Sequence, residues 1–179
     1  LIGLRIFLAN YHTEIEKTYG ANPIKAILYR MGQKPGDIVA DEILKKYDKN
    51  PSQPFDVPTA AFTLFQNTIT KLYDSEIISQ EEKNDRFILK IKNVCAFRNV
   101  IKSRTEIEYG GTLCEFTAGY FETALKQMTG MSVEYQFQPG DTTEDHCIVN
   151  IIFLKKTKTL KSITNEAQQI NIITEKNNI

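Results

Sequence analysis

Residues 110–154, GGTLCEFTAGYFETALKQMTGMSVEYQFQPGDTTEDHCIVNIIFL, decide the fold class. After two opening glycines, apolar side chains recur at the spacing of a helix packed on one side. This stripe comprises Leu113, Phe116, Tyr120, Phe121, Ala124, Leu125 and Met128. Gly130 suits a helix C-cap, and apolar residues then alternate over 132–138 and again over 147–154. The pattern predicts a long helix that leads directly into a β-hairpin.

Apolar residues at helical spacing also predict four helices in the first part of the chain. The first covers residues 4–19, and the second runs from Asn22 to Gly32. The third follows Pro35, and the fourth begins at Thr59 after a proline-rich connection. Because glycine and proline interrupt helices, we expect a break between the second and third.

The middle of the chain predicts the rest of a small sheet. Residues 87–92 alternate apolar and polar side chains, which is typical of a half-buried strand. A second short strand is expected around Cys95, Phe97 and Val100, and the charged stretch 75–86 is interpreted as a loop or frayed turn. The chain therefore predicts an α+β fold, with helices packed on a small antiparallel sheet and a long helix leading into a C-terminal β-hairpin.

Composition favours one domain over residues 1–154, followed by a terminal helix or flexible extension over 155–179. The chain has 179 residues, of which 41% are apolar and 25% are charged. Its 22 basic and 22 acidic residues cancel, which gives no reason to expect a nucleic acid partner. An odd number of scattered cysteines fits a reducing compartment, so we expect a cytoplasmic protein. The opening apolar run, LIGLRIFLA, is shorter than the ~20 residues of a membrane helix.

The sequence shows none of the patterns by which an enzyme is recognised, such as a nucleophile motif, a phosphate-binding loop or metal-ligand spacing. We therefore expect no catalytic residue, no cofactor and no metal site. One alternative stays open, because Cys114, His146 and Cys147 would suit zinc if the long helix and the last strand lay side by side. Against it, a buried cysteine commonly acts as a small apolar side chain.

Charged residues give two further candidates. Glu115 and Glu122 lie two turns apart on the long helix with no base or nucleophile beside them in sequence, so we interpret them as facing solvent. Arg98, Lys102 and Arg104 form a modest basic cluster. That cluster would either hold an anionic ligand or only keep the surface soluble.

Two parts of the chain together resemble a known family. The first is AILYRMGQKPGDIVADEIL, residues 26–44, and the second combines a patterned helix, a Gly-Asp turn and a cysteine in the last strand. The residues of the second part are Cys114, Phe116, Gly119, Leu125, Gly140, Asp141 and Cys147. This pattern is similar to the 4-vinyl reductase domain family, which is related in fold to the core subunits of the TRAPP membrane-tethering particle.

The resemblance implies a dimer formed through the N-terminal helices and an apolar pocket, without catalysis. We expect a binding or sensor domain for an apolar small molecule, with a TRAPP-like scaffold subunit and its heteromeric protein partners as the alternative. An enzyme acting on tetrapyrrole-like substrates ranks last. The chain departs from both relatives, because it lacks a cysteine before the Gly-Asp turn and has none in residues 50–59.

The expected ligand site lies between the long helix and the sheet. Its predicted residues are Phe116, Gly119, Tyr120, Phe121, Tyr135 and Phe137. A glycine inside a helix costs roughly 1 kcal/mol relative to alanine, so Gly119 indicates close approach of a second backbone or of a ligand. We favour close helix packing at that position. For any one aromatic side chain of the set, we favour ordinary core over a ligand contact.

Overall fold

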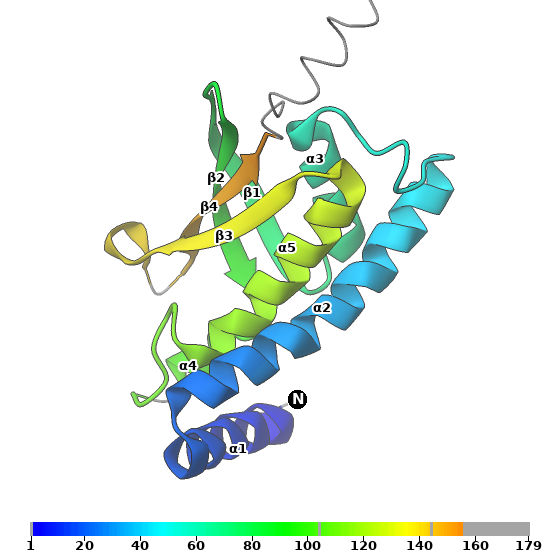
Figure 1. Ribbon diagram of the computed structural model, residues 1–179. Coiled ribbons are helices and arrows are strands. Elements are labelled where there is room, and N and C mark those ends of the chain that lie inside the picture. The colour runs from blue at the N-terminus through cyan, green and yellow to red at the C-terminus, as the bar shows by residue number, and fades with distance from the viewer. Residues whose placement is uncertain (1, 104, 144, 156–179) are drawn as a thin grey trace, which may run out of the picture.

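The computed structural model describes residues 2–103, 105–143 and 145–155, so nearly all of the predicted C-terminal extension lies outside the described residues. Helices and strands alternate in blocks along the chain (Figure 1). In chain order they are α1 (Ile2–Tyr19), α2 (Ala21–Lys46), α3 (Pro58–Ile69), β1 (Tyr73–Glu82), β2 (Arg86–Cys95), α4 (Arg98–Lys102), η1 (Thr112–Cys114), α5 (Glu115–Thr129), β3 (Ser132–Gln138), η2 (Pro139–Asp141) and β4 (Cys147–Leu154).

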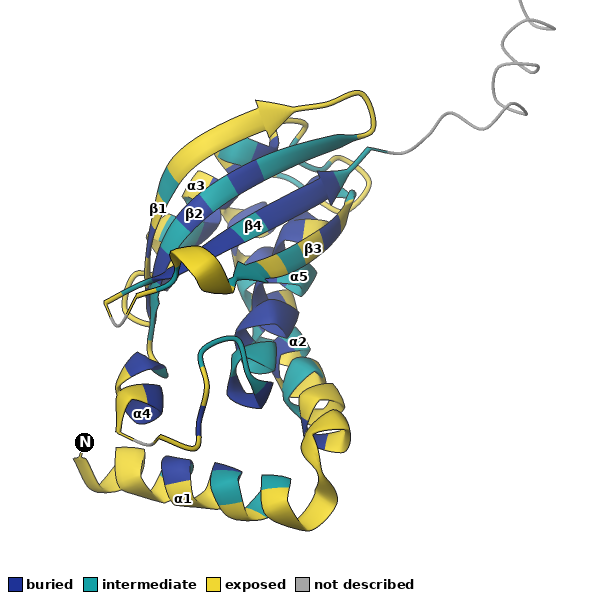
Figure 2. Ribbon diagram, turned by 90° about the vertical axis from the view of Figure 1, so that its left-hand side faces the viewer, coloured by how far each residue is buried: buried dark blue, intermediate teal, exposed yellow. Residues whose placement is uncertain are grey.

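The four strands form one antiparallel sheet in the order β1-β2-β4-β3. Strand β4 is interior, and its Val149 pairs with Ile91 of β2 and with Phe137 of β3. Helices α3 and α5 cover one face of this sheet, and α2 lies across α5 (Figures 1 and 2). The α+β class and the helix-to-hairpin unit are as the sequence predicts.

The main core fills the space between α5, α3 and the sheet. Phe121 is fully buried, and its ring centroid lies 5.0 Å from that of Phe65, 5.1 Å from Tyr73 and 5.5 Å from Tyr135. These edge-to-face contacts add to the burial of apolar area, and truncating such a phenylalanine typically costs about 3–5 kcal/mol. The predicted apolar stripe of the long helix is therefore its buried face.

Helix α2 is continuous, so the predicted break between residues 32 and 35 is wrong. A Cβ on Gly32 would lie 2.1 Å from the carbonyl oxygen of Phe116, and one on Gly36 would lie 2.7 Å from that of Tyr120. The two glycines therefore let the backbone of α2 press against α5. Packing along this seam offsets the ~3 kcal/mol that Pro35 costs inside a helix. The helix also begins one residue before Asn22, and its N-cap position is Gly20.

The prediction for Gly119 is confirmed in its helix-packing form. A Cβ on this residue would lie 2.1 Å from the carbonyl oxygen of Tyr29 on α2, so the close neighbour is a backbone. The predicted C-cap at Gly130 is confirmed as well, and Gly20 follows the last residue of α1. Gly20 and Gly130 have φ angles of 81° and 65°, the left-handed region that glycine adopts without strain.

The middle of the chain needs two corrections. Residues 75–86, predicted as a loop, largely form β1, whose alternate residues Tyr73 and Ser75 are buried while the remainder is mostly exposed. Pairing with β2 stabilises this strand, although its polar sequence does not predict one. The predicted strand around Phe97 and Val100 does not form, because residues 98–102 are the short helix α4.

Candidate functional site

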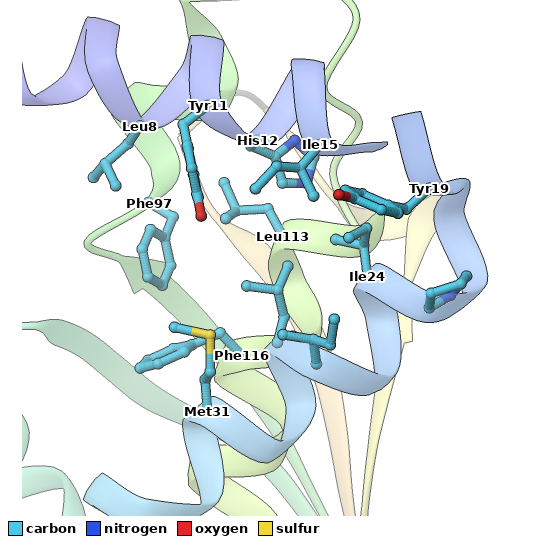
Figure 3. A pocket seen from close by; sticks show the side chains of 13 residues that line it. Leu8, Tyr11, His12, Ile15, Tyr19, Ile24, Met31, Phe97, Leu113 and Phe116 are labelled. Atoms are coloured by element: carbon cyan, nitrogen blue, oxygen red, sulfur yellow. The ribbon is translucent and has the colours of Figure 1, made fainter. Parts of the chain in front are cut away.

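An apolar groove opens between α1 and α2, beside the first turn of α5 (Figure 3). Its cavity has a volume of about 490 Å³, which falls within the 300–1,000 Å³ typical of small-molecule sites. The lining side chains are Leu8, Tyr11, His12, Ile15 and Tyr19 of α1, Pro23, Ile24, Ile27, Leu28 and Met31 of α2, and Phe97, Leu113 and Phe116. The exposed wall is almost entirely apolar.

The groove exists because α1 and α2 diverge from the turn at Gly20. Helix α2 is held against α5 by its glycines, whereas α1 rests on a second, smaller hydrophobic cluster below the sheet (Figure 2). In that cluster Ala9 packs with Val100, Ile101, Ile107 and Leu113. Two helices supported on different parts of the molecule leave a space between them, which Tyr11 and Tyr19 enter from α1 (Figure 3).

One polar cluster adjoins this apolar wall. The Nε2 atom of His12 lies 2.6 Å from Oγ1 of Thr112, and the Thr112 hydroxyl donates to the Glu16 carboxylate at 2.8 Å. The side chain of His12 is only 6% exposed, and its Nδ1 atom is buried without a hydrogen-bond partner among the described residues. Burial lowers the pKa of His12 below 6.5, and the nearby Glu16 opposes the shift only in part. The imidazole is therefore neutral at pH 7.

The structure brings only one of the six predicted site residues to this groove, namely Phe116. Tyr120 and Phe121 are buried in the main core, where their rings contact Phe65 and Tyr73. Tyr135 and Phe137 pack against the same core from β3, and the added Cβ of a residue at Gly110 would collide with the Phe137 ring. Gly119 meets Tyr29. Apart from Phe116, the aromatic side chains of the predicted set therefore pack in the main core.

The cysteines offer no reactive or metal-binding centre in the described part of the chain. No group of three or more His, Cys, Asp and Glu side chains there is placed to hold a metal ion, so the zinc alternative gains no support. Burial raises the pKa of Cys95 and Cys147, and it raises that of Cys114 to about 12. The thiols are therefore protonated at pH 7, which makes them poor nucleophiles.

Of the predicted basic cluster, Arg98 is buried and so is not part of a surface patch. The Arg98 side chain is 5% exposed and donates to the Thr143 carbonyl oxygen and to Sγ of Cys147. Its guanidinium also lies 4.8 Å from the centre of the Tyr109 ring. Lys102 pairs with Asp145 at 3.4 Å, and Arg104 lies outside the described residues. Arg98 therefore fastens α4 to the end of the β3–β4 connection.

The interpretation of Glu122 as a solvent-facing residue is also wrong. Its carboxylate accepts hydrogen bonds from the Tyr29 hydroxyl on α2 and from the backbone N–H of Tyr135 on β3, the latter at 2.7 Å. Three elements are thus joined at one side chain. Burial and the bond to Glu122 raise the pKa of Tyr29, which keeps this phenol protonated.

Sequence reasoning predicted helices over the two segments that form the groove, but it did not predict the groove. Leu8, Tyr11 and Ile15 fall on the apolar face of α1, and Ile24 and Met31 fall on that of α2, so periodicity alone marks them as buried. The structure instead leaves Tyr11 57%, Ile27 43% and Met31 56% exposed. The divergence of the two helices produces this exposure, and no local pattern encodes it.

Comparisons with known proteins support the fold. No family model and no curated protein matches the sequence. Among solved structures, a trafficking protein particle complex subunit 3 from Naegleria fowleri, covalently bound to palmitic acid, superposes with a TM-score of 0.54 at 17% identity. The match covers 86% of this chain and 93% of that one.

A second solved structure is the phenol-responsive sensory domain of the transcription activator PoxR with phenol. It superposes with a TM-score of 0.59 at 14% identity, over 91% of this chain and 80% of that one. Its fold is like that of the 4-vinyl reductase domains. The chain therefore shares one fold with a tethering-particle subunit and with a small-molecule sensory domain, and identities this low establish the fold alone. No helix among the described residues is long and apolar enough to cross a membrane.

Proposed function

We propose that this chain is a non-catalytic binding domain whose groove between α1 and α2 holds an apolar small molecule. The observation that carries the proposal is the cavity of about 490 Å³ with an almost wholly apolar wall. Burying apolar ligand surface in such a space yields about 25 cal/mol per Å². The neighbours agree with this use of the fold, since one is described with palmitic acid and the other with phenol.

No enzymatic role enters the proposal. Among the described residues that line the groove, His12 is the one histidine; the Glu16 carboxylate lies 3.5 Å from its ring and accepts a hydrogen bond from Thr112. The buried thiols carry raised pKa values and lie outside the groove lining. We also propose a cytoplasmic location, because all three cysteines are free thiols, as a reducing compartment would keep them.

The test is to fill the groove. Met31→Trp places a bulky indole ring on the groove wall. The position is 56% exposed, so the helix tolerates the change. Ile38→Trp makes a comparable change on the same helix at 48% exposure, but Ile38 does not line the groove. The probe is N-phenyl-1-naphthylamine, a neutral apolar dye whose fluorescence reports its binding. In a fluorescence titration its affinity should weaken at least about tenfold in Met31→Trp and stay unchanged in Ile38→Trp.

Equal dye affinity in both variants and the unchanged protein would contradict a ligand site in this groove. Native mass spectrometry of protein isolated from its own source extends the test. A small molecule that is present under gentle conditions and lost on denaturation would identify the natural ligand by mass.

A second candidate is a TRAPP-like assembly subunit, and a separate observation favours it. Leu4, Phe7 and Tyr11 recur at helical spacing on α1 and are between 56% and 60% exposed. Ile27, Met31 and Ile38 form a matching face on α2, between 43% and 56% exposed. Exposed apolar surface of this extent is typical of protein contacts. We propose that a second copy of the chain covers it in a homodimer, with heteromeric partners as the further expectation of the scaffold role.

A further inference from the structure

One side of the groove is open to solvent. Tyr11, Tyr19 and Met31 line the groove and yet remain 57%, 67% and 56% exposed. Small-molecule sites typically bury about 70–90% of a ligand's surface. Because these side chains keep more than half of their surface in water, a ligand between α1 and α2 would also keep one of its sides in water. A single copy of the chain therefore forms an incomplete site for an apolar ligand.

The apolar surface of the groove continues onto the outside of the molecule. On α1, the ring of Phe7 stacks on that of Tyr11 with the two centroids 5.8 Å apart, and Leu4 lies one turn before Phe7. On α2, Ile38 follows Met31 by two turns, which returns it to the same side of the helix. Leu4, Phe7 and Ile38 are between 48% and 60% exposed, and they lie outside the groove lining. The open side of the groove is thus part of a wider exposed apolar face.

A second copy of the chain fits this face by area and by chemistry. Six large apolar side chains form the face: Leu4, Phe7, Tyr11, Ile27, Met31 and Ile38. At roughly 200 Å² for each, their exposed fractions supply about three-quarters of the ~800 Å² that each partner buries in a stable interface. Lys34 lies between Met31 and Ile38, and its apolar stem can follow the face while its charge stays in water. In a symmetric dimer each copy presents the same patch to the other, so apolar surface meets apolar surface.

We propose that a second copy closes the groove, so that two chains together complete each ligand site. This inference rests on the proposed function and on the homodimer proposed with it. A ligand in the groove adds its outer apolar side to the interface and so supplies part of the area that the face lacks. Closing an unoccupied groove would instead enclose about 490 Å³ of space without packing contacts. The ligand and the second copy therefore stabilise each other's binding.

The experiment measures this coupling in both directions, with N-phenyl-1-naphthylamine as the ligand. Fluorescence titrations of the full chain are made below and above the protein concentration at which the copies associate. We expect the dye to bind at least about threefold more tightly to the dimer than to the monomer. Because each dimer has two grooves, linkage then requires saturating dye to lower the dimer dissociation constant by the square of that factor, about tenfold. Sedimentation velocity with and without dye measures this second quantity.

Two variants separate closure of the groove from the groove wall itself. Phe7→Glu places a charge on the outer face at a position that is 60% exposed and outside the groove lining. Its dye affinity should stay at the value of the dilute parent protein at every protein concentration. Ile78→Glu on β1, at 51% exposure, is the matched control and should keep the rise in dye affinity with protein concentration. A rise that persists in Phe7→Glu and disappears in Ile78→Glu would overturn closure through this face.

The titrations of the parent protein separate this inference from the proposed function. Equal dye affinity in monomer and dimer refutes closure and leaves the ligand site in place. Dye that weakens the dimer also refutes closure, because the second copy would then compete with the ligand for the groove. A protein that stays monomeric with saturating dye has the same meaning. The proposed function itself fails if the dye binds neither to the monomer nor to the dimer.

Discussion

At the scale of single residues, His12 links the stability of the fold to pH. Its imidazole is 6% exposed, and burial lowers its pKa below the 6.5 of a free side chain. Glu16 is the charged group that faces it, and Thr112 packs against it from the turn before α5. Because the folded state resists protonation, the unfolded state binds the proton first as the pH falls.

This argument predicts the direction of the pH dependence. The free energy of unfolding should not depend on this histidine well above pH 6.5, and it should fall as the pH drops below 6.5 toward the lowered pKa of the folded state. His12→Phe should flatten this part of the curve, and His146→Gln at a half-buried position is the control. Urea unfolding at a series of pH values measures the effect. A slope that survives His12→Phe would assign it to other groups.

The residue scale also shows where sequence reasoning about the site succeeds and where it stops. Phe121 lies on a helical apolar stripe, and that pattern is the same whether the ring faces ligand or core. Only the three-dimensional contacts with Phe65 and Tyr73 decide for core. The hydrogen bond of His12 depends on Thr112, one hundred residues away in the chain, and no local pattern links the two.

At the scale of elements, the seam between α2 and α5 governs the arrangement of the helices. Gly32 and Gly36 on one helix and Gly119 on the other allow backbone-to-backbone contact. The sequence predicts a close approach at Gly119 because glycine is costly inside a helix. It does not predict an unbroken α2, because local propensity argues for a break at Gly32 and Pro35, and long-range packing outweighs it. Strand β1 was missed for a similar reason, since pairing with β2 orders a polar edge.

We expect Gly119→Ala to destabilise the fold by about 3 kcal/mol or more. The new Cβ would lie 2.1 Å from the Tyr29 carbonyl oxygen. Overpacking typically costs about 1–3 kcal/mol, and a contact with rigid backbone lies at the upper end of that range or beyond it. Gly3→Ala on α1 is the control, because nothing lies within 4 Å of its Cβ, and it should change stability by no more than about 1 kcal/mol. Chemical denaturation of both variants gives the comparison. A Gly119→Ala protein as stable as the parent would mean that the helices separate easily.

At the scale of the whole molecule, the apolar faces of α1 and α2 border the same groove, since Tyr11, Ile27 and Met31 belong to both. Six side chains make up the combined face: Leu4, Phe7, Tyr11, Ile27, Met31 and Ile38. At roughly 200 Å² for each large side chain, their exposed fractions amount to roughly 600 Å² per copy. A stable interface buries about 800 Å² per partner, so this face supplies most of what a dimer needs.

A competing surface for self-association lies at the far edge of the sheet. Strand β1 is an edge strand with mostly exposed residues, and its free backbone groups can pair with another strand. Its Ile78 is 51% exposed and provides a matched position for a charge. The two surfaces predict opposite outcomes for two otherwise equivalent substitutions, which makes the site of dimerisation directly testable.

We expect Phe7→Glu to weaken the dimer at least about a hundredfold and Ile78→Glu to leave it intact. Phe7 is 60% exposed, and its ring stacks on Tyr11 at 5.8 Å, so a glutamate there would be desolvated at the centre of the α1 face. Hot-spot aromatic residues typically contribute 2 kcal/mol or more, roughly, and burying an unpaired charge adds to the loss. Sedimentation velocity across a concentration series measures both variants. The reverse result would place the interface on β1. A parent protein that stays monomeric at micromolar concentration would exclude a homodimer through either surface, and a different chain should then cover the apolar face of α1 and α2.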